Sequence, residues 1–143
     1  MGVGFDFFTQ AAQAAPTPAP VPKVVLLPAE RGDGMEVAAA FTQEGGQLYM
    51  ELTVTNRGAV VLSDFAMQYN KNAYGLTPAC APAFGAVPPG QSADARVLIL
   101  RQPAMVAPPA PGTDPNVLQI AVRTNVGKIY FFTGTLPPNY ITQ

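Results

Sequence analysis

The sequence predicts an all-β fold. Short segments alternate apolar and polar residues with the period of two that half-buried strands require. Turn-forming residues interrupt these segments about every 8–12 positions, which is typical of two-sheet sandwiches. No long stretch keeps the 3.6-residue apolar period of an amphipathic helix. With 143 residues there is room for one domain and one core, so we expect an immunoglobulin-like antiparallel β-sandwich of seven or eight strands.

The beginning of the chain differs in composition from the rest. Residues 9–22 contain four prolines and five alanines and no charged side chain. Proline fixes φ and lacks a backbone donor, so such a segment favours an extended, solvated chain. We therefore expect residues 1–22 to be a flexible Pro/Ala-rich linker or tail, and residues 23–143 to form the β-sandwich domain.

Four strand patterns fill the first half of the domain. A short strand is expected at residues 24–27, before a glycine-containing turn. Two longer strands then place these apolar residues on one face each: Met35, Val37, Ala39 and Phe41, followed by Leu48, Met50, Leu52 and Val54. The fourth pattern alternates Phe65, Met67 and Tyr69, which we expect in the core. It stops at Asn70-Lys71-Asn72, whose side chains should hydrogen-bond local backbone groups.

Proline-rich crossings separate the strands of the second half. A coil with several prolines leads to a strand at residues 93–100, and a second such crossing, residues 103–115, leads to a final hairpin. The hairpin strands are expected at residues 116–124 and 128–136. Prolines placed in crossings remove no hydrogen bond from a sheet, so they agree with this division.

The residue types present argue against catalysis. The chain has no histidine, the commonest general base and zinc ligand, and one cysteine cannot build a thiolate metal site. No two carboxylates are spaced to share a proton, and no glycine-rich segment has the lysine of a phosphate loop. We expect neither an enzyme nor a cofactor, and no catalytic or metal-binding residue.

Charge and cysteine content limit the partners and the compartment. The net charge is −1, with 8 basic and 9 acidic residues, so capture of nucleic acid by clustered cations is disfavoured. Apolar runs are far shorter than the roughly 20 residues that span a bilayer, so no direct membrane insertion is expected. Cys80 is the only cysteine, which excludes an intrachain disulfide and favours a reducing, cytoplasmic location.

The last hairpin offers a candidate binding face. We expect Thr124 to pair with Ile129, which fixes the register of both strands. The outward face would then consist of Gln119, Ala121, Arg123, Tyr130 and Phe132. The inward set would be Ile120, Val122, Ile129 and Phe131. An exposed aromatic beside a cation and a small residue suits a short peptide that carries an aromatic and an acid. Alternatively, the aromatic only stiffens the hairpin by packing on Arg123.

Three segments together resemble a known family. They are "SDFAMQYNKNAYGLTP" (residues 63–78), residues 23–58, and "VLQIAVRTNVGKIYFFTGTLPP" (residues 117–138). They are similar to the appendage, or ear, of beta-adaptins, the large beta subunits of clathrin adaptor complexes, and match its N-terminal immunoglobulin-like sandwich subdomain. The family's platform subdomain is not matched. Its acidic, leucine-rich clathrin-binding pattern is also absent from residues 1–22, so clathrin itself is a weaker expectation.

The resemblance implies a protein-interaction module in vesicle-mediated transport and endocytosis. Its partners would be accessory proteins with short aromatic and acidic motifs, and other adaptor subunits through the parent chain. Its place would be cytoplasmic, on clathrin-coated vesicles of the trans-Golgi or plasma membrane. The family's peptide site maps onto Gln119, Ala121, Arg123 and Tyr130. The alternative is a structural sandwich spacer without a peptide site. A carbohydrate-binding sandwich is weaker, because the chain has no tryptophan to stack on sugar.

The N-terminal segment "GVGFDFF", residues 2–8, contains its own candidate ligand. Asp6 stands among Phe5, Phe7 and Phe8, and this segment is too short to build a core. An acid among phenylalanines resembles the motifs that adaptor ears bind. We therefore expect that the segment can dock on the outward face of the last hairpin, with Asp6 meeting Arg123. The alternative is that these residues are only the end of the linker.

Overall fold

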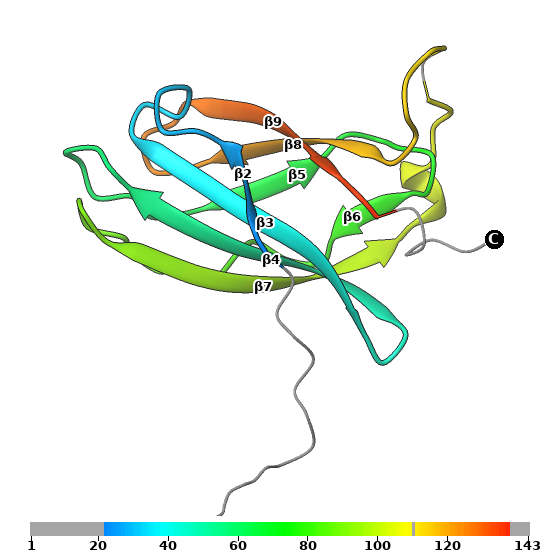
Figure 1. Ribbon diagram of the computed structural model, residues 1–143, viewed down its shortest axis with the longest axis horizontal. Coiled ribbons are helices and arrows are strands. Elements are labelled where there is room, and N and C mark those ends of the chain that lie inside the picture. Colours follow the sequence, from blue (N-terminus) through cyan, green and yellow to red (C-terminus); the bar gives the residue numbers. More distant parts are fainter. Residues whose placement is uncertain (1–21, 110, 138–143) are drawn as a thin grey trace, which may run out of the picture.

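Two antiparallel sheets packed face to face form the domain (Figure 1). The computed structural model describes residues 22–109 and 111–137. The larger sheet has the order β2-β3-β4-β7-β6, with β2 (Val24–Leu27), β3 (Met35–Glu44), β4 (Gln47–Asn56), β7 (Ser92–Arg101) and β6 (Leu76–Pro78). The smaller sheet has the order β5-β8-β9, with β5 (Ala66–Tyr69), β8 (Val117–Arg123) and β9 (Ile129–Thr135).

The predicted all-β sandwich is confirmed for the described residues. One turn of 3₁₀ helix, η1 (Pro103–Met105), interrupts the second proline-rich crossing. The short strand β6 lies where the sequence indicated only coil, at the edge of the larger sheet. Pro78 is tolerated there because an edge strand leaves one row of backbone groups unpaired. In the part of the chain that the structure describes, no helix has the length and apolar character needed to cross a bilayer.

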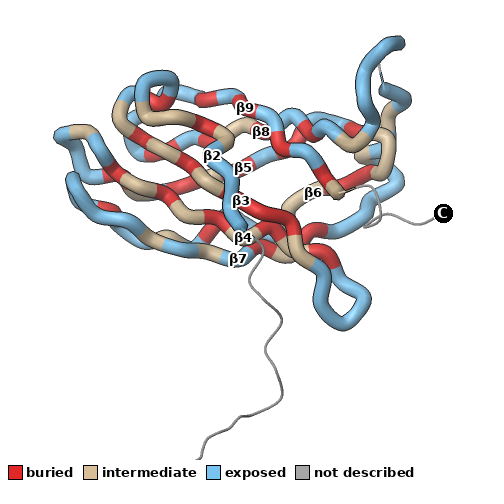
Figure 2. Tube along the Cα trace, viewed as in Figure 1, coloured by how far each residue is buried: buried red, intermediate tan, exposed pale blue. Residues whose placement is uncertain are grey.

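Alternation along the strands builds the core between the two sheets (Figure 2). The inward residues of β3 and β4 are buried as predicted, and Met50 and Val54 have no exposed surface. From the other side, Phe65, Met67 and Tyr69 close the core. The Tyr69 hydroxyl donates to Met50 Sδ at 2.9 Å. Burial of a large apolar side chain contributes roughly 1.5–3 kcal/mol, so this layer of buried side chains is a major source of stability.

Two buried asparagines replace missing backbone partners where the chain leaves the sheets. Asn72 Nδ2 donates to the carbonyls of Asn70 and Leu76, at 3.0 and 2.9 Å. Its Oδ1 accepts from the amides of Tyr74 and Leu76, at 3.3 and 2.9 Å. The predicted role of the Asn-Lys-Asn segment is thus confirmed for Asn72. Asn56, the last residue of β4, does the same at the end of that strand.

The predicted register of the last hairpin is wrong by one residue. Arg123 pairs with Ile129, and Ala121 pairs with Phe131. Thr124 does not join the ladder: its carbonyl accepts from the Gly127 amide at 3.0 Å and its Oγ1 accepts from the Val126 amide at 3.2 Å. The loop therefore takes one residue more than expected, and a one-residue shift moves every side chain of β9 to the opposite face.

This shift exchanges the inward and outward aromatics of β9. Tyr130 and Phe132, predicted to be exposed, keep only 6% and 5% of their surface accessible. Phe131 and Ile129, predicted to be buried, are 65% and 47% exposed. The inward positions of Ile120 and Val122 on β8 are as expected. The predicted linker, residues 1–22, lies outside the described residues except for Pro22, as do residues 138–143 of the predicted domain.

Candidate functional site

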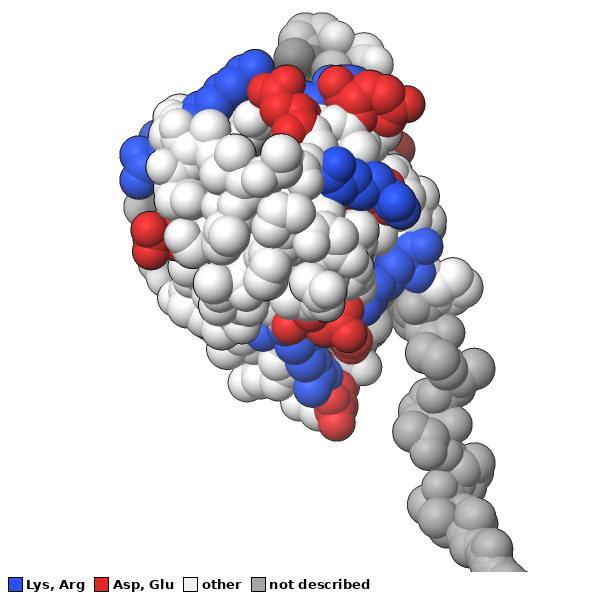
Figure 3. All heavy atoms as spheres, turned by 90° about the vertical axis from the view of Figure 1, so that its left-hand side faces the viewer, with Lys and Arg blue, Asp and Glu red and all other residues white. Residues whose placement is uncertain are grey.

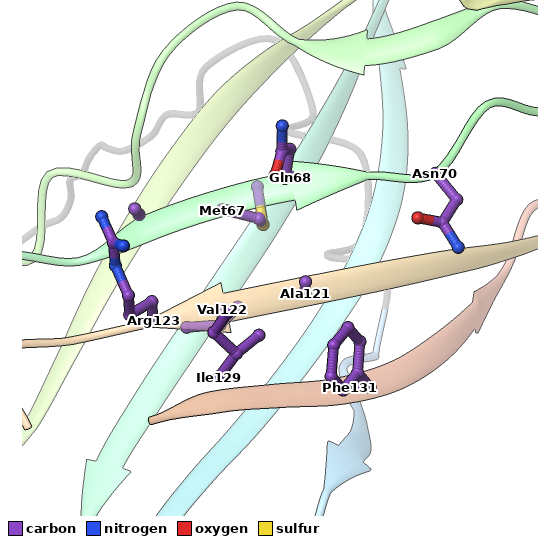
Figure 4. Close-up of a pocket in the computed structure, with 9 residues that line it drawn as sticks. Met67, Gln68, Asn70, Ala121, Val122, Arg123, Ile129 and Phe131 are labelled. Carbon is purple, nitrogen blue, oxygen red and sulfur yellow. The ribbon is translucent and has the colours of Figure 1, made fainter. Parts of the chain in front are cut away.

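The outer face of the three-stranded sheet contains a groove of about 390 Å³ (Figure 4). Its floor is β8, flanked by β5 on one side and β9 on the other. The registers place Gln68 opposite Ala121, and Ala121 opposite Phe131. Because the methyl group of Ala121 lies between two larger side chains, the face is hollowed at its centre. The lining residues are Ala66, Met67, Gln68, Asn70, Ala121, Val122, Arg123, Ile129 and Phe131.

One border of the groove is apolar. Phe131 and Ile129 extend from β9, two positions apart and on the same face (Figure 4). Their exposed fractions, given above, are high for apolar side chains, whose contact with water is unfavourable. A ligand that covers the Phe131 ring would remove this surface from solvent, and aromatic contacts of that kind dominate many small interfaces.

Arg123 stands at one end of the groove (Figure 4). Within residues 22–109 and 111–137, no hydrogen bond or ion pair holds its guanidinium group, and no Asp or Glu lines the groove. A guanidinium without a partner can donate two parallel hydrogen bonds to a carboxylate. The groove therefore combines an aromatic contact with an anion-binding group.

The outer face of the larger sheet shows the opposite arrangement. Arg96 forms ion pairs with Glu44 and Glu51 and lies 3.8 Å from the centre of the Tyr49 ring. Elsewhere on that face, Thr53 donates to Asp94 at 2.6 Å. These charges already have partners in the folded chain, so that face has little to gain from an acidic ligand. The contrast favours the β5-β8-β9 face as the binding surface.

Hydrogen bonds fix the far end of the groove. Asn70 Nδ2 donates to Gln119 Oε1 at 2.7 Å, and the Asn70 amide donates to the Gln119 carbonyl at 2.9 Å. The second bond continues the β5–β8 ladder beyond Tyr69. Gln119 thus closes this end through Asn70. The side-chain Oδ1 of Asn70 and Nε2 of Gln119 can still hydrogen-bond to the backbone of an extended ligand.

Three of the five predicted site residues lie on this face. Gln119 and Arg123 are exposed and Ala121 is half-buried beside them. Tyr130 and Phe132 are on the opposite, buried side and cannot contact a ligand in the groove. Sequence reasoning missed Phe131, Ile129 and the β5 residues. A sequence signal for β9 was present, because the polar residues Thr133 and Thr135 alternate with Gly134 and the apolar Leu136. Counting back in twos from Leu136 gives Phe132 and Tyr130 as inward positions.

Comparisons with known proteins agree with this architecture. No protein-family model matches the chain. AP-1 complex subunit beta-1 of Mus musculus is 40% identical over 114 residues, which is 78% of this chain and 12% of that protein. The Homo sapiens subunit is 36% identical over 115 residues, with the same coverage. AP-1 complex subunit beta of Dictyostelium discoideum is 34% identical over 82 residues, 57% of this chain and 9% of that protein.

A solved structure supports the fold independently of sequence. The GAE domain of yeast GGA1 superimposes with a TM-score of 0.54 at 14% identity, covering 81% of this chain and 99% of that one. The chain belongs to the beta-adaptin appendage family. It spans 12% of the length of the mouse and human AP-1 subunits, so the similarity concerns the sandwich and not the whole subunit.

In this beta-adaptin appendage, Asp33 holds the hairpin that forms the groove. It lies in the turn between β2 and β3, with a φ of 53°. Its Oδ2 accepts from the Tyr130 hydroxyl and from Lys128 Nζ, both at 2.9 Å. The hydrogen bond from Lys128, followed by that from Tyr130, lowers the pKa of the Asp33 carboxyl. Burial, together with the nearby carboxylate, raises the pKa of the Tyr130 hydroxyl.

The Asp33 contacts predict a pH-dependent contribution to the stability of the appendage. Because folding lowers this pKa, the contribution is complete above the unfolded value of about 3.9 and is lost as the pH falls through the folded value. Asp33→Asn keeps the shape and tolerates positive φ. We expect it to destabilise the chain at pH 7, with a difference from wild type that shrinks below about pH 4. Urea unfolding from pH 2.5 to 7 measures this. A difference that is constant with pH would contradict the assignment.

The loop end of the appendage sandwich is a second exposed surface. Figure 3 shows it as largely uncharged, with acidic and basic side chains at its margins. The exposed apolar residues Val60, Val61 and Val126 belong to loops that meet there. Asn125 joins two of these loops, because its Oδ1 accepts from the Ser63 amide at 2.9 Å and its Nδ2 donates to the Val61 carbonyl at 3.0 Å. A cation and an aromatic, Lys128 and Tyr130, also lie there. Both polar groups are already held by the Asp33 carboxylate, unlike Arg123 in the groove.

Proposed function

We propose that this appendage sandwich recruits accessory proteins to a clathrin adaptor complex by binding short aromatic and acidic peptides in the β5-β8-β9 groove. The observation that carries the proposal is the pairing of an exposed Phe131 with an Arg123 that has no partner among the described residues. A peptide aromatic packs on Phe131 over the Ala121 floor, and a peptide carboxylate meets the guanidinium. The chain acts by binding and performs no chemistry.

The similarity to AP-1 beta subunits supports the cellular side of the proposal. A segment of such a subunit would work on the cytoplasmic face of coated vesicles, at the trans-Golgi or plasma membrane. In this proposal, contacts with other adaptor subunits and with clathrin are made by other parts of the adaptor beta subunit. The alternative role, a sandwich that only spaces a larger assembly, requires no ligand in the groove.

Selection from a random heptapeptide library tests the proposal. With the full chain as bait, we expect peptides that combine an aromatic residue with Asp or Glu. Arg123→Glu should weaken their binding about tenfold or more, because it replaces attraction by repulsion. Phe131→Ser should weaken it similarly, since it removes the aromatic contact. Isothermal titration calorimetry with the selected peptides measures both effects.

Arg31→Glu is the matched control, because it makes the same change of charge at an exposed arginine outside the groove. It should leave affinity within about twofold of wild type, since surface charges away from the contact act only weakly. If the selected peptides bind the Arg123 and Phe131 variants as tightly as wild type, the groove is not their site. If no peptide is selected at all, the spacer role is favoured.

A further inference from the structure

The chain itself contains a peptide with the chemistry that the groove fits. Residues 2–8 read GVGFDFF, and Asp6 is the only charged residue before Lys23. We propose that this segment occupies the β5-β8-β9 groove of its own chain, and that accessory peptides must displace it. The inference rests on the proposed function, because it assigns the same groove an internal competitor.

Spacing within the segment matches spacing on the sheet. In an extended peptide, residues two apart lie on the same side, about 6.8 Å from each other. Arg123 and Ala121 are also two apart on β8, and Ala121 is the residue opposite Phe131. With Asp6 at the Arg123 guanidinium, Phe8 therefore lies over Ala121 and against the Phe131 ring. Phe7 then points away from the sheet.

The path from the domain to the groove is short. Pro22, the first described residue, shares a hollow with Thr133 and Thr135 of β9. Thr133 is exposed on the same face of the sheet as Phe131. The 13 residues from 9 to 21 can span up to about 43 Å. The ten-residue strand β3, one of the longest in the domain, measures only about 33 Å, so any position on this face is within reach.

Tethering makes a weak ligand effective. A segment on a linker of this length has an effective concentration on the order of 1 mM at the groove. If it binds with a dissociation constant near 100 μM, an external peptide of similar affinity appears about tenfold weaker than its intrinsic value. The segment would thus restrict the groove to partners with several motifs or with high affinity.

Amide chemical shifts of the full 143-residue chain test the contact. We expect Phe8→Ser and Asp6→Lys each to move the signals of Gln68, Ala121 and Phe131. Phe7→Ser is the matched control, because it removes one phenylalanine from the side that faces away, and it should leave these signals in place. Combining Asp6→Lys with Arg123→Glu should restore the original shifts, since it exchanges the two charges.

Three results would overturn the inference. The first is groove signals that do not respond to Phe8→Ser. The second is an equal response to Phe7→Ser, which would show no preferred side. The third is a response that disappears on dilution from 500 to 20 μM, which would assign the contact to a second copy of the chain.

A competition experiment separates this inference from the proposed function. A synthetic peptide of residues 2–8 should bind the Phe8→Ser chain about tenfold more tightly than the wild-type chain, in which the groove is occupied. Equal affinity for the two chains would overturn self-occupancy and leave the groove as a peptide site. No binding of this peptide, together with binding of library-selected peptides, would also overturn only the inference. If neither the synthetic peptide nor any library-selected peptide binds, both the self-occupancy inference and the proposed function are wrong.

Discussion

Phe132→Ala is expected to lower the free energy of unfolding by about 3–5 kcal/mol, while Phe131→Ala changes it by about 0.5 kcal/mol or less. The two residues are neighbours in sequence and have identical side chains. Phe132 is in the core cluster with 5% of its surface exposed, whereas Phe131 is 65% exposed. Truncating a buried ring leaves a cavity, and truncating an exposed ring does not.

Urea titration followed by circular dichroism measures both variants of β9. Phe131→Ala should retain the wild-type spectrum, so it can also serve in binding experiments. If the order of the two costs is reversed, with the larger loss for Phe131→Ala, the hairpin has the register in which Thr124 pairs with Ile129. The groove would then be lined by Tyr130 instead of Phe131.

Asn72→Ala is expected to cost about 2–4 kcal/mol, because it leaves buried backbone groups without partners. Two carbonyls lose their donor and two amides lose their acceptor, all within the turn that links β5 to β6. Water cannot readily replace these contacts, since Asn72 is 9% exposed.

Asn70→Ala is the matched control for Asn72. Asn70 is the same residue type two positions earlier, but it is exposed, and among the described residues its side chain hydrogen-bonds only to Gln119. We expect a cost of about 1 kcal/mol or less for Asn70→Ala, since water can hydrate the freed Gln119. Thermal or urea unfolding of the two variants gives the comparison. Equal costs would mean that the Asn72 network contributes no more than an ordinary surface hydrogen bond.

Strands with an unambiguous alternation were predicted well from the sequence. In β3 and β4 the large aliphatic positions and Phe41 recur every second residue, and apart from Tyr49 the residues between them are polar or small, so one face is clearly the buried one. The Ile129-Tyr130-Phe131-Phe132 run is different, because four consecutive apolar residues fit either face. The pattern within this run cannot choose between registers. The choice depends on the alternation of Thr133 and Thr135 with Leu136 that follows it, and on contacts with distant parts of the chain.

Two long-range hydrogen bonds and one strand pairing shape the candidate site. Asp33 binds Tyr130 from a turn 97 positions earlier, and Asn125 binds Ser63 across 62 positions. The β5 side of the groove comes from residues that sequence analysis treated only as core or turn. Its place beside β8 follows from sheet topology, which no local pattern contains. Gln119, Ala121 and Arg123 could be predicted because β8 alternates cleanly.

The hydrogen bond between Asp33 and Tyr130 gives the turn after β2 an influence on which aromatic ring lines the groove. A shift of the β9 register by one residue would exchange Phe131 for Tyr130 on the outer face and expose the buried Leu136 side chain to solvent. By accepting a hydrogen bond from the Tyr130 hydroxyl at 2.9 Å, Asp33 favours the arrangement in which a phenylalanine lines the groove. The identity of the presented ring therefore depends partly on a residue outside the groove. Under the proposed function, peptide preference among related appendages can then diverge through this turn even where every groove-lining residue is the same.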